Sequence, residues 1–281
     1  MRPSVLLQYV LPHRALSRIV YWATRWTWRP WKNWLIGQIT RRYAVDLGEA
    51  AEPDVATFAH FNAFFTRALK VGARPQDADP DAVLCPADGR ISQAGAIREG
   101  RIFQAKGQHF TAAELLGDEH AAQPYHGGEF VTVYLSPRDY HRVHMPLRGT
   151  LVGTLHVPGR LFSVAPFAVQ AIPRLFARNE RLVCHFDGEH GPFAVILVGA
   201  MLVSSVSTVW GDLEIPPYAS APRARDFRGS GIDLDRGAEM GRFNMGSTVI
   251  VLLPHGGPHL DAGLVAEQAV RVGQRLGTHA G

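Results

Sequence analysis

Cysteine is nearly missing from the sequence, in which only Cys85 and Cys184 occur. Two cysteines cannot build the dense disulfide network of a small secreted scaffold, and they favour a reducing compartment. Long apolar runs are missing too. The best candidate, residues 193–203, falls short of the ~18 consecutive apolar residues of a spanning helix and contains Gly199. This run predicts a buried strand instead.

Lysine is also scarce, with Lys32, Lys70 and Lys106 the only three in the chain. A mechanism that needs a catalytic lysine is therefore restricted to very few positions. Apolar residues nevertheless make up 46% of the 281 positions, which excludes a disordered protein, because such chains cannot offset their conformational entropy. A chain of this length can bury a sizeable core without disulfides.

Acidic residues are absent from residues 1–45, which carry eight basic residues and five of the six tryptophans. Apolar residues recur there at helical spacing, and Pro12 and Pro30 divide the segment. Tryptophan suits a membrane interface because its ring is apolar and its N–H is polar, while arginine attracts anionic headgroups. We therefore predict helices that bind a membrane surface. Nucleic-acid binding, packing on the chain's own domain and dimerisation are the alternatives.

Two short motifs contain groups that can carry proton chemistry. Residues 86–89 (PADG) have the composition of an ordinary β-turn, or they hold a carboxylate, Asp88, that orients a histidine. Residues 134–146 contain His141 and His144, whose imidazoles titrate near neutrality. A zinc site at these histidines would lack the further ligands that it needs. Two interpretations are favoured instead. The histidines are a general base and a second acid–base group, or they are two polar residues on a loop.

A third motif, residues 243–248, places Ser247 at a glycine bend that leads into an apolar strand. The bend is either structural or a device that holds the serine beside an exposed peptide bond. It is not the Gly-x-Ser-x-Gly elbow of an α/β-hydrolase, because no glycine follows two residues after Ser247. The chain order Asp88, His144, Ser247 still permits a catalytic triad.

Taken together, these motifs resemble the bacterial phosphatidylserine decarboxylase proenzymes, a family of pyruvoyl-dependent enzymes. The resemblance runs nearly end to end, and one departure is Met245, where the family usually has leucine. The matching segments are residues 7–9 (LQY), 11–12 (LP), 61–65 (FNAFF) with Arg67, 74–75 (RP), 86–89, 104–107 (QAKG), 134–146, 158–159 (PG), 161–164 (LFSV), 176–181 (FARNER), 239–243 (EMGRF) and 246–248 (GST).

The resemblance implies that the chain cuts itself between Gly246 and Ser247. Ser247 Oγ would attack the Gly246 carbonyl carbon, with His144 as the base and Asp88 orienting it. The products would be a β chain of residues 1–246 and an α chain of residues 247–281. The serine would become a covalent pyruvoyl group, so neither a metal nor pyridoxal phosphate is expected as cofactor.

The resemblance also implies the reaction. The pyruvoyl ketone would take up the amine of phosphatidylserine and act as electron sink while carbon dioxide leaves. His141 is the candidate for the proton donor that completes phosphatidylethanolamine. We expect the chain at the cytoplasmic face of the cell membrane as a peripheral protein of phospholipid biosynthesis. Its expected partners are anionic lipid and its own two chains as a heterodimer, with a further homodimer left open and no nucleic acid.

We predict an α+β fold in which N-terminal amphipathic helices, residues 1–45, precede a mostly antiparallel β catalytic domain, residues 46–281. Near the start of this domain, the aromatic-rich residues 58–69 predict a short helix. Two other functions remain open. The chain could be a membrane-associated serine hydrolase that uses Asp88, His144 and Ser247 without cutting itself, or a non-enzymatic module that binds anionic lipid. Only the decarboxylase should split its own chain.

Overall fold

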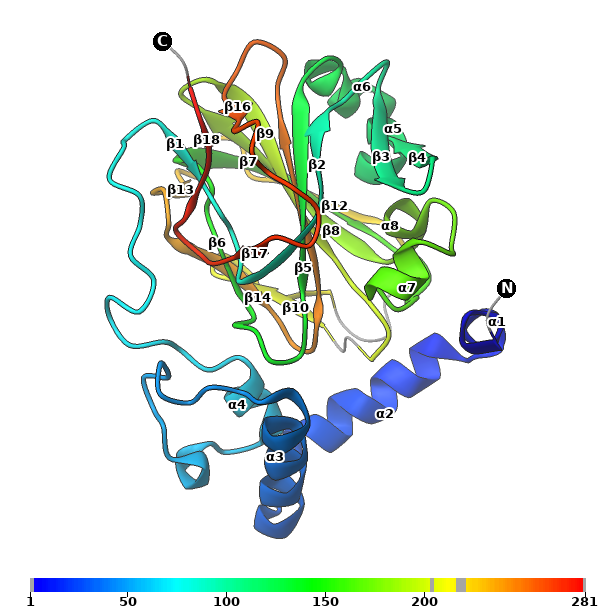
Figure 1. Cartoon of the computed structure of the whole chain (residues 1–281), viewed down its shortest axis with the longest axis vertical. Coiled ribbons are helices and arrows are strands. Elements are labelled where there is room, and N and C mark those ends of the chain that lie inside the picture. The colour runs from blue at the N-terminus through cyan, green and yellow to red at the C-terminus, as the bar shows by residue number, and fades with distance from the viewer. Residues whose placement is uncertain (1–2, 203–204, 216–220, 280–281) are drawn as a thin grey trace.

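The computed structural model describes residues 3–202, 205–215 and 221–279, with helices at the N-terminal end and strands through most of the rest (Figure 1). The helices are α1 (Pro3–Val10), α2 (His13–Arg25), α3 (Arg29–Tyr43), η1 (Val55–Thr57), α4 (Phe61–Phe65), α5 (Ala112–Leu116), α6 (Glu119–Ala122), η2 (Gln123–Tyr125), α7 (Pro166–Val169) and α8 (Leu175–Arg178). The predicted α+β fold is confirmed.

Antiparallel pairing dominates the strands. The strands are β1 (Ala82–Leu84), β2 (Gly89–Ala96), β3 (Arg101–Ala105), β4 (Gln108–Thr111), β5 (Glu129–Leu135), β6 (Arg142–His144), β7 (Gly149–Val157), β8 (Arg181–Gly188), β9 (Gly191–Val198), β10 (Val206–Thr208), β11 (Asp212–Ile215), β12 (Arg223–Asp226), β13 (Asp233–Leu234), β14 (Glu239–Phe243), β15 (Ser247–Leu253), β16 (His259–Leu260), β17 (Ala269–Val270) and β18 (Arg275–Thr278). The largest sheet has nine strands in the order β12-β7-β8-β9-β15-β5-β2-β17, with β13 beside β7. A second sheet has four strands in the order β11-β10-β14-β6. Its strand β14 ends at Phe243, and the bend before β15 follows directly.

Strand β15 is the central strand of the large sheet and is buried at every residue. It pairs with β5 on one side and β9 on the other. Side chains alternate along a strand, so Val249 and Val251 enter one hydrophobic core while Ile250 and Leu252 enter the other. A strand that is covered on both faces must be apolar throughout, which explains the unbroken apolar run in the sequence.

Two expected elements are shorter than predicted. The run at residues 193–203 forms β9 only as far as Val198, and Val203 lies outside the described residues. The predicted helix over residues 58–69 is reduced to α4, Phe61–Phe65. His60 caps the start of α4 by accepting from the Ala63 N–H, and the Thr66 hydroxyl donates to the Asn62 carbonyl at its end.

The prolines divide the N-terminal segment as predicted. Pro12 separates α1 from α2, and Pro30 occupies the first turn of α3, where its missing N–H costs nothing. The segment also packs on the rest of the chain: the Ser163 N–H donates to Gln8 Oε1 at 2.8 Å, and the Leu161 N–H donates to His13 Nδ1 at 3.3 Å. In the described part of the chain, no helix combines the length and apolar character needed to cross a bilayer.

Candidate active site

Ser247 begins β15 directly after a tight bend. It pairs with Leu135 of β5, and its side chain has an exposed fraction of 0%. Among the described residues its Oγ has no hydrogen-bond partner. Burying a hydroxyl without a partner is costly, so an orphaned hydroxyl in a folded protein points to a functional reason. The Gly246 carbonyl carbon is bonded to the Ser247 nitrogen, and Oγ reaches it by closing a five-membered ring.

Met245 holds a strained backbone conformation beside the predicted cleavage site. Its φ angle is +116°, a region that residues other than glycine rarely adopt, at a cost on the order of 1–3 kcal/mol. Its side chain packs against the aromatic cluster of α3 and α4. Asn62 Nδ2 donates to Asn244 Oδ1 at 3.0 Å, and Asn244 Nδ2 donates to Ser205 Oγ at 2.8 Å. These contacts hold the bend in its strained form.

His141 lies against the same peptide. A Cβ atom placed on Gly246 would be 4.0 Å from His141 Cε1, which is an ordinary contact distance. The imidazole is fully buried and stacks on Phe65 of α4, with ring centroids 4.0 Å apart. The structure thus brings the His141 imidazole near the Gly246–Ser247 peptide, beside Phe65 of α4.

The surroundings of His141 fix its protonation state. Burial lowers its pKa to about 3, and the positive charge of Arg67 acts in the same direction. The carbonyls of Ser136 and Pro137 oppose this effect, but neither forms a hydrogen bond of good geometry with the ring. His141 is therefore a neutral imidazole at physiological pH, and no group of the described residues forms a hydrogen bond with either of its nitrogens.

Asp88 is bound by an arginine and by the C-terminal segment. Arg74 Nε donates to the two carboxylate oxygens at 2.9 and 3.0 Å, and the Val272 N–H donates to Oδ1 at 2.9 Å. Arg74 also pairs with Glu49 at 2.8 Å. The Arg74–Asp88 pair is largely buried, and charge-assisted bonds of this kind are strong. Asp88 is accordingly well anchored, but not by a histidine.

His144 lies on β6 with its ring oriented by uncharged groups. Its Nδ1 is 2.8 Å from the Gly237 carbonyl oxygen, which can only accept, so Nδ1 carries the proton. Its Nε2 is then an acceptor and lies 3.2 Å from the Tyr140 hydroxyl. Burial lowers the pKa of His144, against the opposing effect of its bond to Gly237. In this neutral tautomer Nε2 has the lone pair that a base requires.

The predicted relay is not connected by hydrogen bonds in the uncut chain. Across the described residues, no such bond joins Asp88 to His144 or His144 to Ser247. The catalytic roles of these three residues therefore stay predictions. Sequence reasoning missed Arg74 as the partner of Asp88, although the Arg-Pro pair at residues 74–75 was among the matching segments and marked it as a candidate.

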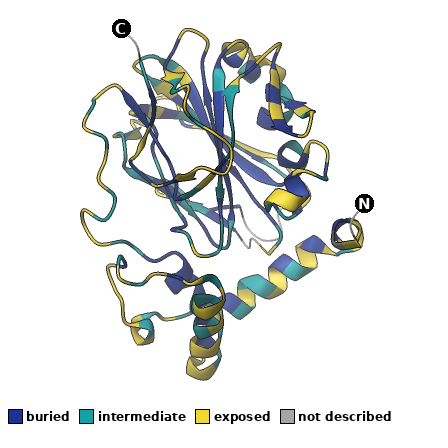
Figure 2. Cartoon of the chain, in the orientation of Figure 1, coloured by how far each residue is buried: buried dark blue, intermediate teal, exposed yellow. Residues whose placement is uncertain are grey.

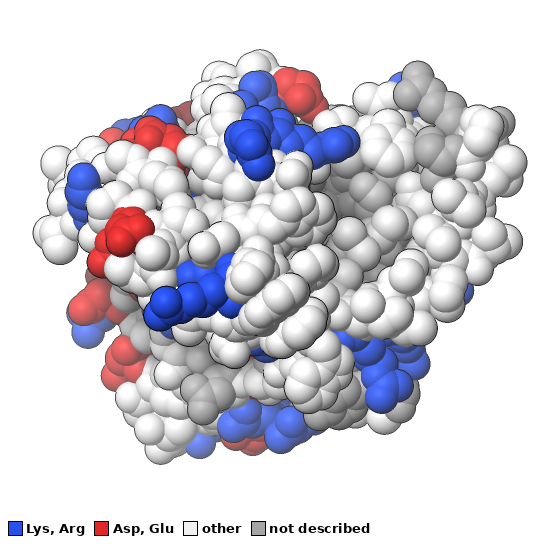
Figure 3. All heavy atoms as spheres, turned by 90° about the horizontal axis from the view of Figure 1, so that it is seen from below, with Lys and Arg blue, Asp and Glu red and all other residues white. Residues whose placement is uncertain are grey.

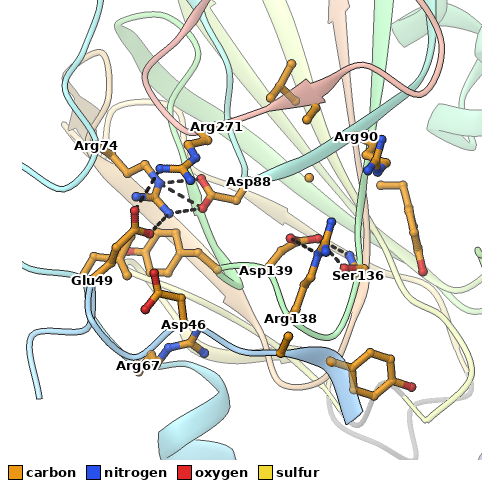
Figure 4. Close-up of a pocket in the computed structure, with 18 of the residues that line it drawn as sticks. Asp46, Glu49, Arg67, Arg74, Asp88, Arg90, Ser136, Arg138, Asp139 and Arg271 are labelled. Atoms are coloured by element: carbon orange, nitrogen blue, oxygen red, sulfur yellow. Dashed lines mark hydrogen bonds and ion pairs between the residues drawn. The ribbon is translucent and has the colours of Figure 1, made fainter. Parts of the chain in front are cut away.

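A cavity of about 560 Å³ opens beside this group of residues (Figure 4). Part of its wall is made by Tyr134 and Ser136, the two neighbours of Leu135, the residue that pairs with Ser247. Arginines outnumber carboxylates around it. The charged lining residues are Arg42, Arg67, Arg74, Arg90, Arg138 and Arg271, with Asp46, Glu49, Asp88 and Asp139. The cavity is thus a predominantly basic chamber, and its lining includes Asp88 and Arg67.

Comparison with known proteins agrees with this geometry. The family model described as phosphatidylserine decarboxylase matches residues 61–278, and a second model, described as PSD, matches residues 3–44. The chain belongs to the phosphatidylserine decarboxylase family. It is 64% identical over 271 residues to a phosphatidylserine decarboxylase proenzyme of Xanthomonas campestris pv. campestris, covering 96% of each chain. A proenzyme of the same name from Stenotrophomonas maltophilia is 59% identical over 273 residues, 97% of this chain and 98% of that one.

The family is a class of pyruvoyl-dependent decarboxylases, and membership confirms the predicted resemblance and enzyme class. The residues at the bend fit a pyruvoyl group made from the chain itself, because the orphaned Ser247 hydroxyl directly follows Gly246 in a buried, strained segment. Within the described residues, no three or more His, Cys, Asp or Glu side chains are arranged so that they could hold a metal ion.

Proposed function

We propose that this chain converts phosphatidylserine to phosphatidylethanolamine in phospholipid biosynthesis, using a pyruvoyl group that it makes at Ser247 by cutting the Gly246–Ser247 bond. The observation that carries the proposal is the buried Ser247 hydroxyl, which has no partner among the described residues, next to a strained bend in a member of this family. The strain at Met245 favours a reaction that releases the bend.

The cleavage uses only the chain and water. Ser247 Oγ adds to the Gly246 carbonyl carbon, the amide nitrogen takes a proton and departs, and the peptide becomes an ester. Loss of the Ser247 Cα proton then expels the Gly246 carboxylate and leaves dehydroalanine. Addition of water and loss of ammonia give the N-terminal pyruvoyl group. A base is needed to take the hydroxyl proton in the first step and the Cα proton in the next.

Base strength and position favour different histidines. His141 lies nearer to Gly246, but with a pKa of about 3 it holds a proton weakly and serves poorly as a base near neutral pH. His144 has a fixed tautomer with an accepting Nε2. We assign the base to His144, with Asp88 as its orienting carboxylate, and this assignment requires Asp88 to exchange part of its contact with Arg74 for the imidazole.

The pyruvoyl group would supply a carbonyl that binds the substrate amine and withdraws electrons as carbon dioxide leaves. Leu135 and His141 flank the position where it forms, and α4 excludes water from that position. His141 is the candidate donor of the proton that is delivered to the substrate Cα. A weakly basic imidazole is a strong acid once it is protonated, which suits it to this step rather than to the first.

The two products of cleavage stay together because of where β15 lies. The segment after residue 246 contributes the central strand β15, and it also contributes β17 beside β2 and β18 beside β1. Removing it would open the large sheet and expose both hydrophobic cores. We therefore propose a tight heterodimer of residues 1–246 and 247–281. A short chain of this size could not build its own core.

The N-terminal helices are proposed as the membrane-binding surface. The buried side of α2 carries His13, Ser17 and Thr24, whereas its Trp22 is 73% exposed (Figure 2). A surface helix of a globular protein usually buries its apolar side chains and exposes its polar ones, so α2 has the opposite arrangement. The exposed apolar side chains of this region are Leu6, Leu7, Val10, Ile19, Trp22, Trp26, Trp28 and Trp34. On the underside of the molecule, Lys and Arg lie between uncharged side chains, and Asp and Glu lie mostly toward one edge (Figure 3).

An apolar surface with scattered basic groups suits an anionic bilayer, since insertion and charge attraction act together. We propose that the chain binds this bilayer peripherally, and that Cys85 and Cys184, both free and buried, support placement on the cytoplasmic face.

Intact mass under denaturing conditions tests the proposed function. The purified protein should give one chain ending at Gly246 and one of residues 247–281 that lacks a free amine, so Edman sequencing of the small chain should be blocked. Ser247→Ala should remain one chain and have no decarboxylase activity. Full activity in a protein that stays one intact chain would exclude the pyruvoyl group and support the serine hydrolase instead.

A further inference from the structure

Arg67 is a buried cation that no carboxylate of the described residues pairs with. It follows α4, its exposed fraction is 5%, and among the described residues it makes no side-chain hydrogen bond or ion pair. Its guanidinium lies over the face of the Phe64 ring, 5.3 Å from the centroid. Charged side chains are almost never buried unless they are paired or bind a ligand, because desolvation costs several kcal/mol.

The carboxylates near Arg67 do not satisfy it. Asp88, Asp46 and Glu49 act on its charge from a distance, yet burial outweighs them and lowers the pKa of Arg67. Glu49 and Asp88 are occupied by Arg74, which binds both. The guanidinium therefore keeps its donors free toward the cavity that it lines (Figure 4).

The position of Arg67 relates it to the reaction centre. Phe65, two residues earlier, stacks on His141, and the His141 ring lies 4.0 Å from the position that a Cβ atom on Gly246 would take. Arg67 is close enough for its charge to act on the His141 ring. An anion bound by Arg67 would thus lie beside the place where the substrate amine must reach residue 247.

We propose that Arg67 binds the phosphodiester of the phosphatidylserine headgroup and so defines the substrate subsite in this cavity. This inference rests on the proposed function. The guanidinium fork matches two oxygens of a phosphate. The substrate carboxylate is the less suitable partner, because a cation that stabilised it would hold the ground state back from losing carbon dioxide. The headgroup is short, so its phosphate has to lie close to the amine.

Binding of soluble phosphates by the full-length protein tests the subsite without relying on turnover. Glycerophosphocholine carries the phosphodiester but has no primary amine, and inorganic phosphate reports on a site for the free ion. In a Ser247→Ala background, calorimetry should show glycerophosphocholine binding that Arg67→Gln weakens roughly 10- to 100-fold, the usual value of a charge-assisted hydrogen bond. The affinity of Arg67→Lys for glycerophosphocholine should lie between that of the parent and that of Arg67→Gln. Arg101→Gln, an exposed arginine on β3, is the matched control and should bind normally.

Kinetics on cleaved protein provide the second arm. Because product and substrate both carry the phosphate, Arg67→Gln should raise KM for short-chain phosphatidylserine by about the same factor and leave kcat within about twofold. Equal glycerophosphocholine binding by the parent and Arg67→Gln would overturn the proposal, as would binding of inorganic phosphate alone. If Arg67→Gln does not fold, the comparison of Arg67→Lys with the parent decides. If the wild-type chain did not cut itself, the proposed function would be refuted. The measurement of glycerophosphocholine binding in the Ser247→Ala background would still test the role of Arg67.

Discussion

Removing each histidine separately distinguishes the two roles assigned to His141 and His144. His144→Ala should accumulate as an uncut chain, because Ser247 then lacks its base. Asp88→Asn should show the same defect, since the amide cannot stabilise a protonated imidazole as a carboxylate does. His141→Ala should cut itself, form the small chain of residues 247–281, and then turn over slowly.

The expected magnitudes follow from the surroundings of each ring. A general base contributes ~10²–10⁴-fold, so slow cutting of His144→Ala over hours to days is consistent with its role. The pKa of about 3 at His141 lies below the ordinary value of 6.5 by an amount worth roughly 5 kcal/mol in proton affinity, at about 1.36 kcal/mol per pKa unit. A base with so low a proton affinity would lose most of the rate acceleration that general-base catalysis gives. The position of His141 near Gly246 is therefore not enough to make it the base in self-cleavage.

The assay is a time course of intact mass after purification, followed by borohydride trapping with phosphatidylserine. Cleaved His141→Ala should be trapped as a covalent adduct although its turnover is slow. The reverse pattern, with His141→Ala uncut and His144→Ala processed, would refute the assignment and make the imidazole beside Gly246 the base. Normal processing of both variants would remove histidine from self-cleavage altogether.

Three further predictions concern stability and attachment. Arg74→Met strands the buried Asp88 carboxylate and should lower the free energy of urea unfolding by about 3–5 kcal/mol; a loss below ~1 kcal/mol would mean that water replaces the arginine. Because the folded pKa of His141 is depressed, the unfolded chain binds the extra proton between pH 6.5 and about 3, so stability should fall as pH drops through that range. His141→Asn in uncut protein should flatten this slope by up to ~1.36 kcal/mol per pH unit, and an unchanged slope would contradict the burial argument. Replacing Trp22 and Trp34 by serine should reduce flotation with anionic vesicles at least severalfold, whereas Phe103→Ser on β3 should not, and high salt should weaken but not abolish binding; equal flotation of all variants would exclude the helices as the membrane surface.

The sequence predicted the elements whose signal is local. The apolar run after Ser247 is unbroken because β15 is covered on both faces, so the run itself predicted a strand. Pro12 and Pro30 marked the helix boundaries by their backbone chemistry. The motifs around Asp88, His144 and Ser247 marked candidate residues, but they contained no distances.

The contacts that the sequence did not predict depend on tertiary register. Nothing in the PADG turn reveals that Asp88 is bound by Arg74 and by the Val272 N–H, since those groups meet only when β17 pairs beside β2. The positive φ at Met245 was equally hidden, because methionine is not a residue that signals such a conformation. The length of α4 was overestimated. Its aromatic residues pack in a hydrophobic cluster with residues of α3, and this packing does not require a longer helix.

The placement of Arg67 beside His141 leads to a last prediction that couples substrate binding to proton transfer. Burial is the larger cause of the low pKa of His141, and the Arg67 charge adds to it. A phosphate bound at Arg67 would cancel part of that charge, so His141 would hold a proton more readily once the headgroup is in place. Arg67→Gln removes the charge permanently and should raise the pKa of His141 in the free protein, though not to 6.5, because the burial remains. An NMR titration of the His141 ring in Ser247→Ala, with and without the Arg67 change, measures this directly. An identical His141 titration in the two proteins would show that the charge does not reach the ring and would separate headgroup binding from the proton step.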